Sequence, residues 1–310
     1  MLRAAEIGAV SNASVSVPVS VVIPAFRRAE LVARAVRSAL SQRPQPDEVI
    51  VVDDCSGDGT GSSARTAGAR VITHVRNGGE GAARNTAIDA SRNDWVAFLD
   101  SDDMWLPGHL ENLWAARDGH VLVGAAGRGS LDGRWYGQPR LRPLLLAGPR
   151  DVIVPHNCVT PSGAMAKRDS LIAVGGFPAR RHVGDLDTWI RLLEHGTGVA
   201  LGVQGFVYEQ HAGQVSVDLE AMSIALMDVI DGYSDRSWWS ASLSRQAEAM
   251  PMWDQARALQ AAGRPTAAAK ALGPFIDPRR LLGLNKLLVS RRHAARRRVG
   301  SVSIMNGDGT

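Results

Sequence analysis

Two acidic clusters follow directly on short apolar runs, and their residue types and spacing suit a divalent cation. Asp53-Asp54 ends one run, and Asp100-Ser101-Asp102-Asp103 directly follows another. Carboxylates packed together repel one another, so such clusters persist best where a cation neutralises them. Oxygen ligands of this kind bind Mg²⁺ or Mn²⁺, which can bridge carboxylates to the phosphate oxygens of a leaving diphosphate. The simpler alternative is that the second cluster is only a solvated turn.

The elements before these clusters must bring them together. Between Val17 and about Ala126, short β-branched runs alternate with amphipathic stretches, which is typical of an α/β fold. We expect strands at residues 19–23, 49–52, 71–74 and 95–99 and helices at residues 30–41 and 81–90, with Pro24 ending the first strand and Thr60 capping a further helix. This order predicts a mostly parallel sheet flanked by helices, in which ligands bind outside the carboxyl ends of the strands. Both acidic clusters should therefore lie at one edge.

The pattern changes in the second half of the chain. Residues 127–151 predict a loop with a helical piece around Leu141–Leu146, and a helix is expected at Asp187–His195. Beyond about Val217 the pattern is helical. We therefore expect three parts: a flexible N-terminal tail at residues 1–16, a catalytic domain at residues 17–216 and a helical C-terminal extension at residues 217–310 that ends in a basic tail.

Several short segments follow one another in a recognisable order: Val19–Phe26, Ser38–Gln42, Glu48–Thr60, Asn77–Gly79 with Gly81–Ile88, and Trp95–Pro107. Through these segments the stretch Val17–Ser216 resembles the GT-A fold glycosyltransferases of family 2. The resemblance implies the GT-A (nucleotide-diphospho-sugar transferase) fold and an inverting enzyme that uses Mn²⁺ or Mg²⁺. Such an enzyme moves a sugar from a nucleotide-diphosphate sugar, with a UDP-sugar favoured, to a hydroxyl acceptor. The acceptor would be a cell-surface glycan or a lipid-linked intermediate.

The resemblance also implies which residues bind the donor. They are Pro24, Phe26, Asp54, Arg84, Asn85 and Asp100. Phe26 would stack on the base, beside Pro24, and Asp54 would accept a hydrogen bond from a uracil-type N–H. Asp100 would lie near the ribose or the sugar. For Arg84 and its neighbour the alternative is a pair that caps a helix or lies at the edge of the core.

The metal site implied by the resemblance has two protein ligands. Asp102 would be the principal metal ligand. His211 would contact the metal or the diphosphate, although a lone histidine is often structural.

The acceptor side depends on the segment Gly184–Arg191. Asp185 falls where the family has the catalytic base that deprotonates the acceptor hydroxyl, so that displacement inverts the anomeric centre. Gly184 stands where glutamate is usual, and Gly175-Gly176-Phe177 matches a family element that precedes the acceptor-side loop. The alternative is that Asp185 and Asp187 are acids stabilised by the dipole at a helix N-terminus.

Charge and hydropathy limit the other classes of protein. No apolar run approaches the roughly 18 residues of a membrane span, and the first sixteen residues lack the apolar segment of a secretory signal. With Cys55 and Cys158 as the two cysteines, we expect a reduced, cytoplasmic protein. Residues 278–307 hold eight basic and no acidic residues, so a helix there could contact the inner face of a membrane or pack its leucines on the body. Without interleaved aromatics, no nucleic acid is expected as a partner.

Rival functions meet specific obstacles. A nicotinamide dehydrogenase or a nucleotidyltransferase needs a glycine-rich phosphate loop after the first strand, where Pro24–Arg28 stands. A phospho-receiver domain is shorter and does not explain Asp100-Ser101-Asp102. A non-catalytic nucleotide-sugar-binding protein of the same fold remains an alternative, against which the intact Asp102 and Asp185 argue.

Overall fold

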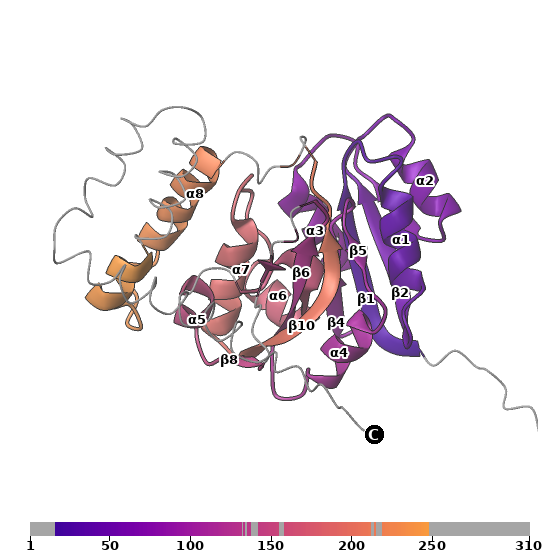
Figure 1. Ribbon diagram of the computed structural model, residues 1–310. Coiled ribbons are helices and arrows are strands. Elements are labelled where there is room, and N and C mark those ends of the chain that lie inside the picture. Colours follow the sequence, from indigo (N-terminus) through magenta and orange to yellow (C-terminus); the bar gives the residue numbers. More distant parts are fainter. Residues whose placement is uncertain are drawn as a thin grey trace, which may run out of the picture. The chain divides into compact units, whose positions relative to one another are not determined.

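A mixed sheet organises the part of the chain that carries the acidic clusters (Figure 1). The computed structural model describes residues 16–131, 133, 135–137, 142–154, 158–211, 214 and 219–247. The chain divides into two compact units, Met1–Gln214 and Val215–Thr310, and the sheet belongs to the first.

Ten strands form this sheet within the described residues. They are β1 (Ser16–Ala25), β2 (Gln45–Asp53), β3 (Arg70–Thr73), β4 (Trp95–Phe98), β5 (Met104–Trp105), β6 (Leu122–Gly129), β7 (Trp135–Tyr136), β8 (Leu144–Leu146), β9 (Ala164–Lys167) and β10 (Gly198–Tyr208). The helices of this unit are α1 (Val32–Leu40), α2 (Thr60–Thr66), α3 (Glu80–Ala90), α4 (His109–Ala115), α5 (Arg150–Ile153), α6 (Arg168–Ala173) and α7 (Gly184–Leu193), with the 3₁₀ turn η1 (Pro161–Gly163).

The sheet has a parallel part and a mixed part. Its order is β3-β2-β1-β4-β9-β6-β10-β5, and β3, β2, β1 and β4 are parallel to one another. β9 is antiparallel to both β4 and β6, while β10 is parallel to β6 and antiparallel to β5 and β8. The predicted α/β fold is therefore confirmed, and its early strands are parallel, but the sheet is not mostly parallel: five of its nine pairings within the described residues are antiparallel.

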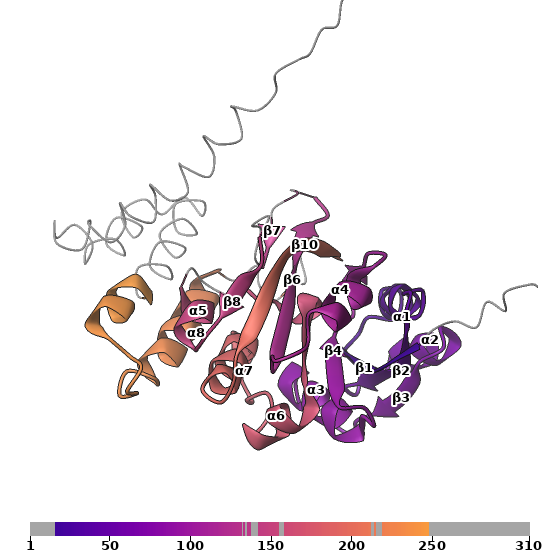
Figure 2. The same cartoon turned by 90° about the horizontal axis from the view of Figure 1, so that it is seen from below.

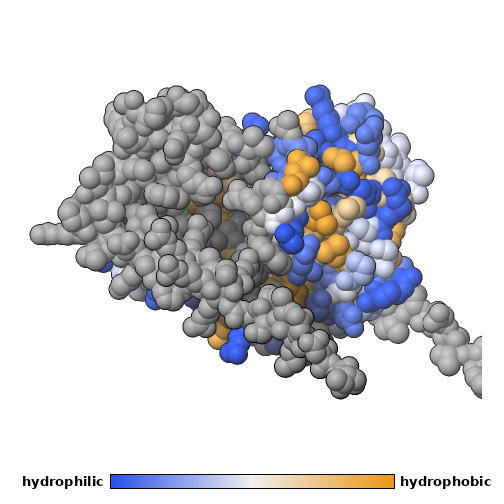
Figure 3. All heavy atoms as spheres, in the orientation of Figure 1, coloured by the Kyte–Doolittle hydropathy of each residue, from blue (hydrophilic) through white to orange (hydrophobic). Residues whose placement is uncertain are grey.

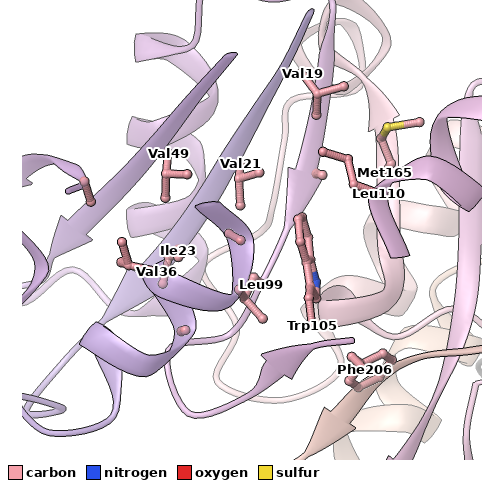
Figure 4. Close-up of a cluster of buried hydrophobic side chains, with 14 of the residues drawn as sticks. Val19, Val21, Ile23, Val36, Val49, Leu99, Trp105, Leu110, Met165 and Phe206 are labelled. Carbon is pink, nitrogen blue, oxygen red and sulfur yellow. The ribbon is translucent and has the colours of Figure 1, made fainter. Parts of the chain in front are cut away.

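From Val19 to Ala25 strand β1 is buried on both faces, which explains the continuous apolar run Val21-Val22-Ile23 in this part of the strand. Val19, Val21 and Ile23 point to one face, where they pack with α1 and α4 (Figure 4). Val22 points to the other face, which α3 covers (Figure 2). Since helices occupy both faces, the carboxyl ends of the strands are left as the place for a site.

Two predictions about element ends are wrong. Strand β1 continues through Pro24 to Ala25 because β4 ends at Phe98, opposite Val22, and leaves no strand to which residue 24 would have to donate. Thr60 does not cap α2 but is its first residue. The N-cap residue is Gly59, and the backbone N–H and the hydroxyl of Thr60 both donate to Asp58 Oδ1, at 3.0 and 2.6 Å.

The predicted helical piece at Leu141–Leu146 is also wrong where it can be described. Leu144–Leu146 is strand β8, which pairs antiparallel with Gly198–Ala200 of β10. A run of three leucines has no period of its own, so the available edge of β10 decides its conformation. Leu141 lies outside the described residues.

The surface of the first unit is largely hydrophilic on the face in Figure 3, with separate hydrophobic spots. Among the predicted site residues only Phe26 is a large exposed apolar side chain, with 39% of its surface accessible. Within the described part of the chain, no helix has both the length and the apolar character to cross a membrane.

The described part of the second unit is helical. It contains α8 (Leu219–Asp231) and a helical stretch at residues 241–247. The basic segment at residues 278–307 lies outside the described residues, so its contact with a membrane stays a prediction.

Candidate active site

The acidic clusters lie at the same edge of the sheet. Asp54 directly follows β2, and Asp100 and Asp102 follow β4; both strands are parallel to β1, which lies between them. The loops are tied to this central strand, since Asp54 N donates to Ala25 O at 2.8 Å and Leu99 N to Val22 O at 3.1 Å. The convergence expected from the sequence is therefore present.

The two predicted metal ligands meet, although 109 positions separate them in the chain. His211 Nε2 lies 2.9 Å from Asp102 Oδ2, and their side chains are 26% and 18% exposed. Arg28 Nε lies 3.7 Å from the same carboxylate oxygen. A carboxylate and an imidazole that remain accessible to solvent fit a divalent cation that takes its other ligands from a phosphate group and water.

No larger metal cluster competes with this pair among the residues that the structure describes. Within them, no three histidine, cysteine or acidic side chains are arranged to hold a metal. The pair thus fits a cation that is completed by a diphosphate better than a closed structural metal site.

A buried ion pair lies next to this position. Arg84 on α3 donates from Nη2 to Asp100 Oδ1 at 2.7 Å and also to Glu80. Its guanidinium carbon lies 5.0 Å from the ring centre of Phe177. Burial opposes the charge of Arg84, but Glu80, Asp100 and Asp185 together raise its pKa. The predicted donor residues Arg84 and Asp100 are therefore in contact, and the charge of Asp185 acts on the same guanidinium.

The pKa of Asp100 reflects a crowded and partly buried cluster of charges. The pKa of Asp100 is raised to about 7, mainly by burial. The neighbouring acids Glu80 and Asp102 also raise this pKa, and the guanidinium of Arg84 lowers it. A carboxylate with this pKa is poorly neutralised by the protein alone, which is the condition that a bound cation relieves.

Asp103 is a structural member of the acidic cluster. Ser162 Oγ donates to its Oδ2 at 2.5 Å, and Glu209 N donates to its Oδ1 at 2.9 Å. Burial raises the pKa of this carboxyl well above its ordinary value. Asp103 thereby ties the loop after β4 to η1 and to the end of β10.

Asp54 is held at the N-terminus of α3. His74 Nδ1 lies 2.6 Å from its Oδ1, while Gly78 N donates to Oδ1 and Gly79 N to Oδ2, each at 2.8 Å. The other ring nitrogen of His74 lies 2.9 Å from Thr86 Oγ1. The helix dipole and these partners fix this carboxylate, whose side chain is only 3% exposed, and its predicted contact with a base stays a prediction.

The loop after β1 presents an aromatic surface. Pro24 is buried in β1, whereas Phe26 is exposed and has the Arg27 guanidinium carbon 5.1 Å from its ring centre. Arg27 N donates to Ser56 Oγ at 2.9 Å, which ties this loop to the segment after Asp54. The ring of Phe26 is therefore accessible, while its predicted stacking on a base and the predicted pocket contact of Pro24 stay predictions.

Asn85 uses its amide on the backbone of a neighbouring turn. Its Nδ2 donates to Phe177 O and its Oδ1 accepts from Phe177 N, both at 2.8 Å. Gly176 has φ +64°, and a Cβ there would collide with Asn85 Oδ1, which explains the glycine. These contacts correspond to the core-edge alternative for Asn85, and its predicted contact with the donor stays a prediction.

The two aspartates of the acceptor segment have different surroundings. Asp187 pairs with Arg191 at 3.0 Å, and Arg191 Nη2 also donates to Gly176 O at 2.8 Å. Asp185 lies in the first turn of α7, two residues after Val183. Asp187 therefore anchors the glycine turn, whereas the predicted base Asp185 faces the charge of Arg84.

The comparisons with known proteins agree with this geometry. The family model described as glycosyl transferase family 2 matches residues 20–175, half of the 310-residue chain. The chain belongs to glycosyltransferase family 2. The succinoglycan biosynthesis protein ExoO of Rhizobium meliloti (strain 1021) is 39% identical over 122 residues, which cover 37% of this chain and 35% of that protein. The chain spans about a third of the length of the curated relatives it matches.

Solved structures of glycosyltransferases have the same fold as this family 2 chain. S. aureus TarS 1-349 in complex with UDP-GlcNAc matches with a TM-score of 0.60 at 19% identity, over 76% of this chain and 72% of that chain. The mannosyltransferase PcManGT from Pyrobaculum calidifontis, in complex with GDP-Man and Mn²⁺, matches with a TM-score of 0.59 at 21% identity, over 90% and 80%. The predicted GT-A fold is confirmed.

Backbone strain lies on the loops of this family 2 site. Within the described residues, the non-glycine residues with positive φ are Arg27 (53°), Cys55 (62°) and Val183 (49°). Each lies one or two residues from a predicted site residue. Such conformations cost about 1–3 kcal/mol and concentrate at active sites, and the β-branched Val183 is the least expected of the three.

Several residues of the site were not expected from the sequence. Arg28, His74, Ser162 and Glu209 all contact a predicted site residue or Asp103. His74 ends a predicted strand next to the strand that precedes Asp54, so the sequence pattern could have predicted that it lies near Asp54. Ser162 and Glu209 reach the site through antiparallel neighbours, for which the sequence carries no local signal.

Proposed function

We propose that this chain is a metal-dependent, inverting glycosyltransferase that takes a sugar from a nucleotide-diphosphate donor. The observation that carries the proposal is the meeting of Asp102 and His211 at 2.9 Å, beside the Arg84–Asp100 pair, at the carboxyl edge of the sheet. A bound Mn²⁺ or Mg²⁺ would neutralise the charge that develops on the leaving diphosphate. The imidazole of His211 favours Mn²⁺ over Mg²⁺, which prefers oxygen ligands.

The donor half of the site suits a diphosphate. Asp102 and His211 would hold the cation, and the guanidinium of Arg28, 3.7 Å from Asp102, would face the same phosphate oxygens. Arg84 is held by Asp100 and Glu80, so it would orient the sugar side of the donor through Asp100.

The hydrogen-bonding capacity of Asp54 favours a uracil base. Its carboxylate already accepts from His74, Gly78 N and Gly79 N. An ionised carboxylate has about four acceptor positions, so about one remains, on Oδ2. One position matches the single N3–H that uracil and thymine present, whereas guanine presents an N1–H and an N2–H that need two acceptors; among the solved structures of this fold, TarS binds UDP-GlcNAc. We therefore propose a UDP-sugar as the donor.

The acceptor half supplies a base. Asp185 would take the proton of the acceptor hydroxyl from the side opposite the diphosphate, so that the sugar is transferred with inversion. Asp187 is paired with Arg191 and does not serve this role. The relative ExoO is named for succinoglycan biosynthesis, which supports a growing cell-surface glycan or a lipid-linked intermediate as acceptor. Contact of the basic segment at residues 278–307 with the inner face of a membrane would suit a lipid-linked acceptor.

The proposed function is tested by binding and hydrolysis together. A thermal-shift screen of UDP, GDP, dTDP and ADP, each with Mn²⁺ or with EDTA, should give the largest rise in Tm for UDP with Mn²⁺, because only a ligand of the folded state stabilises it. UDP release from UDP-sugars should then require Mn²⁺. A rise in Tm without release from any donor would indicate a binding protein. No rise with any nucleotide would reject the donor site.

A further inference from the structure

The segment that carries His211 is held by side chains of another part of the chain. Arg34, on α1, donates from Nη2 to Glu209 Oε2 at 2.7 Å and to the backbone oxygen of Asp102 at 3.1 Å. One guanidinium thus touches both segments that carry the candidate metal ligands. α1 itself belongs to the parallel part of the fold, where it packs under β1 and β2.

Glu209 is fixed from further directions. Its other carboxylate oxygen accepts from Ser130 Oγ at 2.8 Å, and its backbone N–H donates to Asp103 Oδ1 at 2.9 Å. Gln214 donates to its carbonyl oxygen. The residue two places before His211 is therefore anchored through both its side chain and its backbone.

We propose that Arg34 and Glu209 are positioning residues that place His211 opposite Asp102 for metal binding. The proposal rests on the proposed function, because it concerns the cation that those two ligands would hold. His211 lies beyond the end of β10, outside the hydrogen bonding of the sheet, and a ligand there would otherwise have to be ordered when the metal binds. The contacts of Arg34 with Glu209 and with the backbone of Asp102 order this segment before the metal binds, so that the entropic cost of ordering it is not incurred on binding.

The alternative is that Arg34 and Glu209 form a surface ion pair with no positioning role, and such pairs contribute little to stability. Three features distinguish the Arg34–Glu209 contact from one. The pair is only partly exposed, at 35% and 23% of the side-chain surface. The same nitrogen reaches the backbone of Asp102. Among the described residues, Arg34 Nε is buried and has no hydrogen-bond partner, so the orientation of the side chain satisfies its outer nitrogen at the expense of the inner one.

The test measures Mn²⁺ binding directly, by the electron paramagnetic resonance signal of free Mn²⁺ in the presence of saturating UDP. Arg34→Met and Glu209→Gln should each raise the Kd for Mn²⁺ about tenfold, as loss of an outer-shell partner typically does. The double variant should be no weaker than either single one, because the two residues act as a unit. Arg34→Lys keeps the positive charge but not the planar guanidinium with its paired donors, so its Kd for Mn²⁺ should lie between those of Arg34→Met and the wild type.

Controls separate positioning from general damage. Arg37→Met changes an exposed arginine one turn along the same helix and should leave the Kd unchanged. UDP binding in EDTA and the Tm should be the same in all of these variants as in the wild type. If Arg34→Met does not fold, Glu209→Gln carries the test, since it preserves size and polarity.

The outcomes distinguish the two proposals. If the wild type does not bind Mn²⁺ at all, both the metal dependence of the proposed function and the positioning role of Arg34 and Glu209 are rejected. The wild type could bind Mn²⁺ and His211→Ala could weaken that binding, while Arg34→Met and Glu209→Gln leave it unchanged. This result would overturn the positioning role of Arg34 and Glu209 and would leave the proposed metal site intact.

Discussion

The two sides of the site are built in different ways. The donor side consists of the ends of β1, β2 and β4, which are parallel neighbours, and Asp54, Asp100 and Asp102 follow those strands directly. The acceptor side consists of η1, the glycine turn before Phe177 and the start of α7, next to strands of mixed direction. On the donor side a residue's place follows from its strand; on the acceptor side it follows from contacts such as that of Asn85 with Phe177.

This difference separates residues that do chemistry from residues that hold the site. The donor side offers accessible groups, such as the carboxylate of Asp102 and the ring of Phe26. Around the glycine turn and the start of α7, the predicted donor residue Asn85 is engaged with the backbone of Phe177 and Asp187 is paired with Arg191, and the charge of Asp185 acts on Arg84. Substitutions on the two sides should therefore have different consequences, in the order below.

The largest effect is expected at Asp102. Asp102→Ala should lower kcat for Mn²⁺-dependent hydrolysis of the donor by about 10³-fold, about 4 kcal/mol, because the leaving diphosphate loses its cation. Steady-state release of UDP measures this. Asp94→Ala is the matched control, since Asp94 is an exposed acid at the opposite end of β4. Equal turnover in the Asp102 variant would show that the cation is held elsewhere.

Asp185 should have the next largest effect. Asp185→Asn should lower kcat about 10²–10³-fold and leave the Kd for UDP unchanged, since a general base acts on the acceptor and not on the donor. Asp187→Asn should leave kcat nearly unchanged and lower the free energy of unfolding by about 1 kcal/mol through loss of its contact with Arg191. The opposite pattern would exchange the roles of the two aspartates.

Much of the donor side could be predicted from the sequence because each element is local. The apolar runs before Asp54 and Asp102 define parallel strands, and parallel strands bring their carboxyl ends together. The acceptor side depends on pairings between distant residues, which no window of the sequence contains. Ser162 was missed for this reason. Leu144–Leu146 was assigned the wrong conformation because the edge of β10, and not local propensity, decides it.

Asn85 should matter for stability and not directly for catalysis. Asn85→Ala removes both hydrogen bonds to the backbone of Phe177, which should lower the free energy of unfolding by about 2 kcal/mol and the Tm by about 4–8 °C. Asn112→Ala, at an exposed position on α4, is the control and should change stability by less than about 0.5 kcal/mol. Calorimetry without ligand gives both values. An unchanged Tm in the first variant would leave Asn85 as a contact of the donor.

Substitution of Asp54 should raise the Kd for UDP about tenfold. Asp54→Asn should weaken UDP binding by about 1.4 kcal/mol because the amide presents one acceptor oxygen in place of two, while Asp89→Asn on the exposed side of α3 should not. Titration with UDP in the presence of Mn²⁺ measures the effect. If the variant only loses stability and binds UDP normally, Asp54 serves as the anion at the N-terminus of α3 and not as a ligand of the base.

The smallest expected effect concerns pH. Burial raises the pKa of Asp100 to about 7, whereas an unfolded aspartate has a pKa of about 4. Between these values the folded chain keeps a proton that the unfolded chain releases, so the free energy of unfolding of the metal-free protein should fall as the pH rises from about 4 to about 7. Asp100→Asn should reduce this fall and raise the Tm at pH 8 by a few degrees, about 1 kcal/mol. An identical pH profile in the variant would contradict the assignment.

The most direct test of the donor site compares UDP with uridine by isothermal titration, with Mn²⁺ or with EDTA. If carboxylate and imidazole hold a cation that binds the diphosphate, Mn²⁺ should tighten UDP binding at least about tenfold and leave uridine binding unchanged. In Asp102→Ala the gain with Mn²⁺ should disappear. Equal affinity for UDP with Mn²⁺ and with EDTA in the wild type would contradict the account.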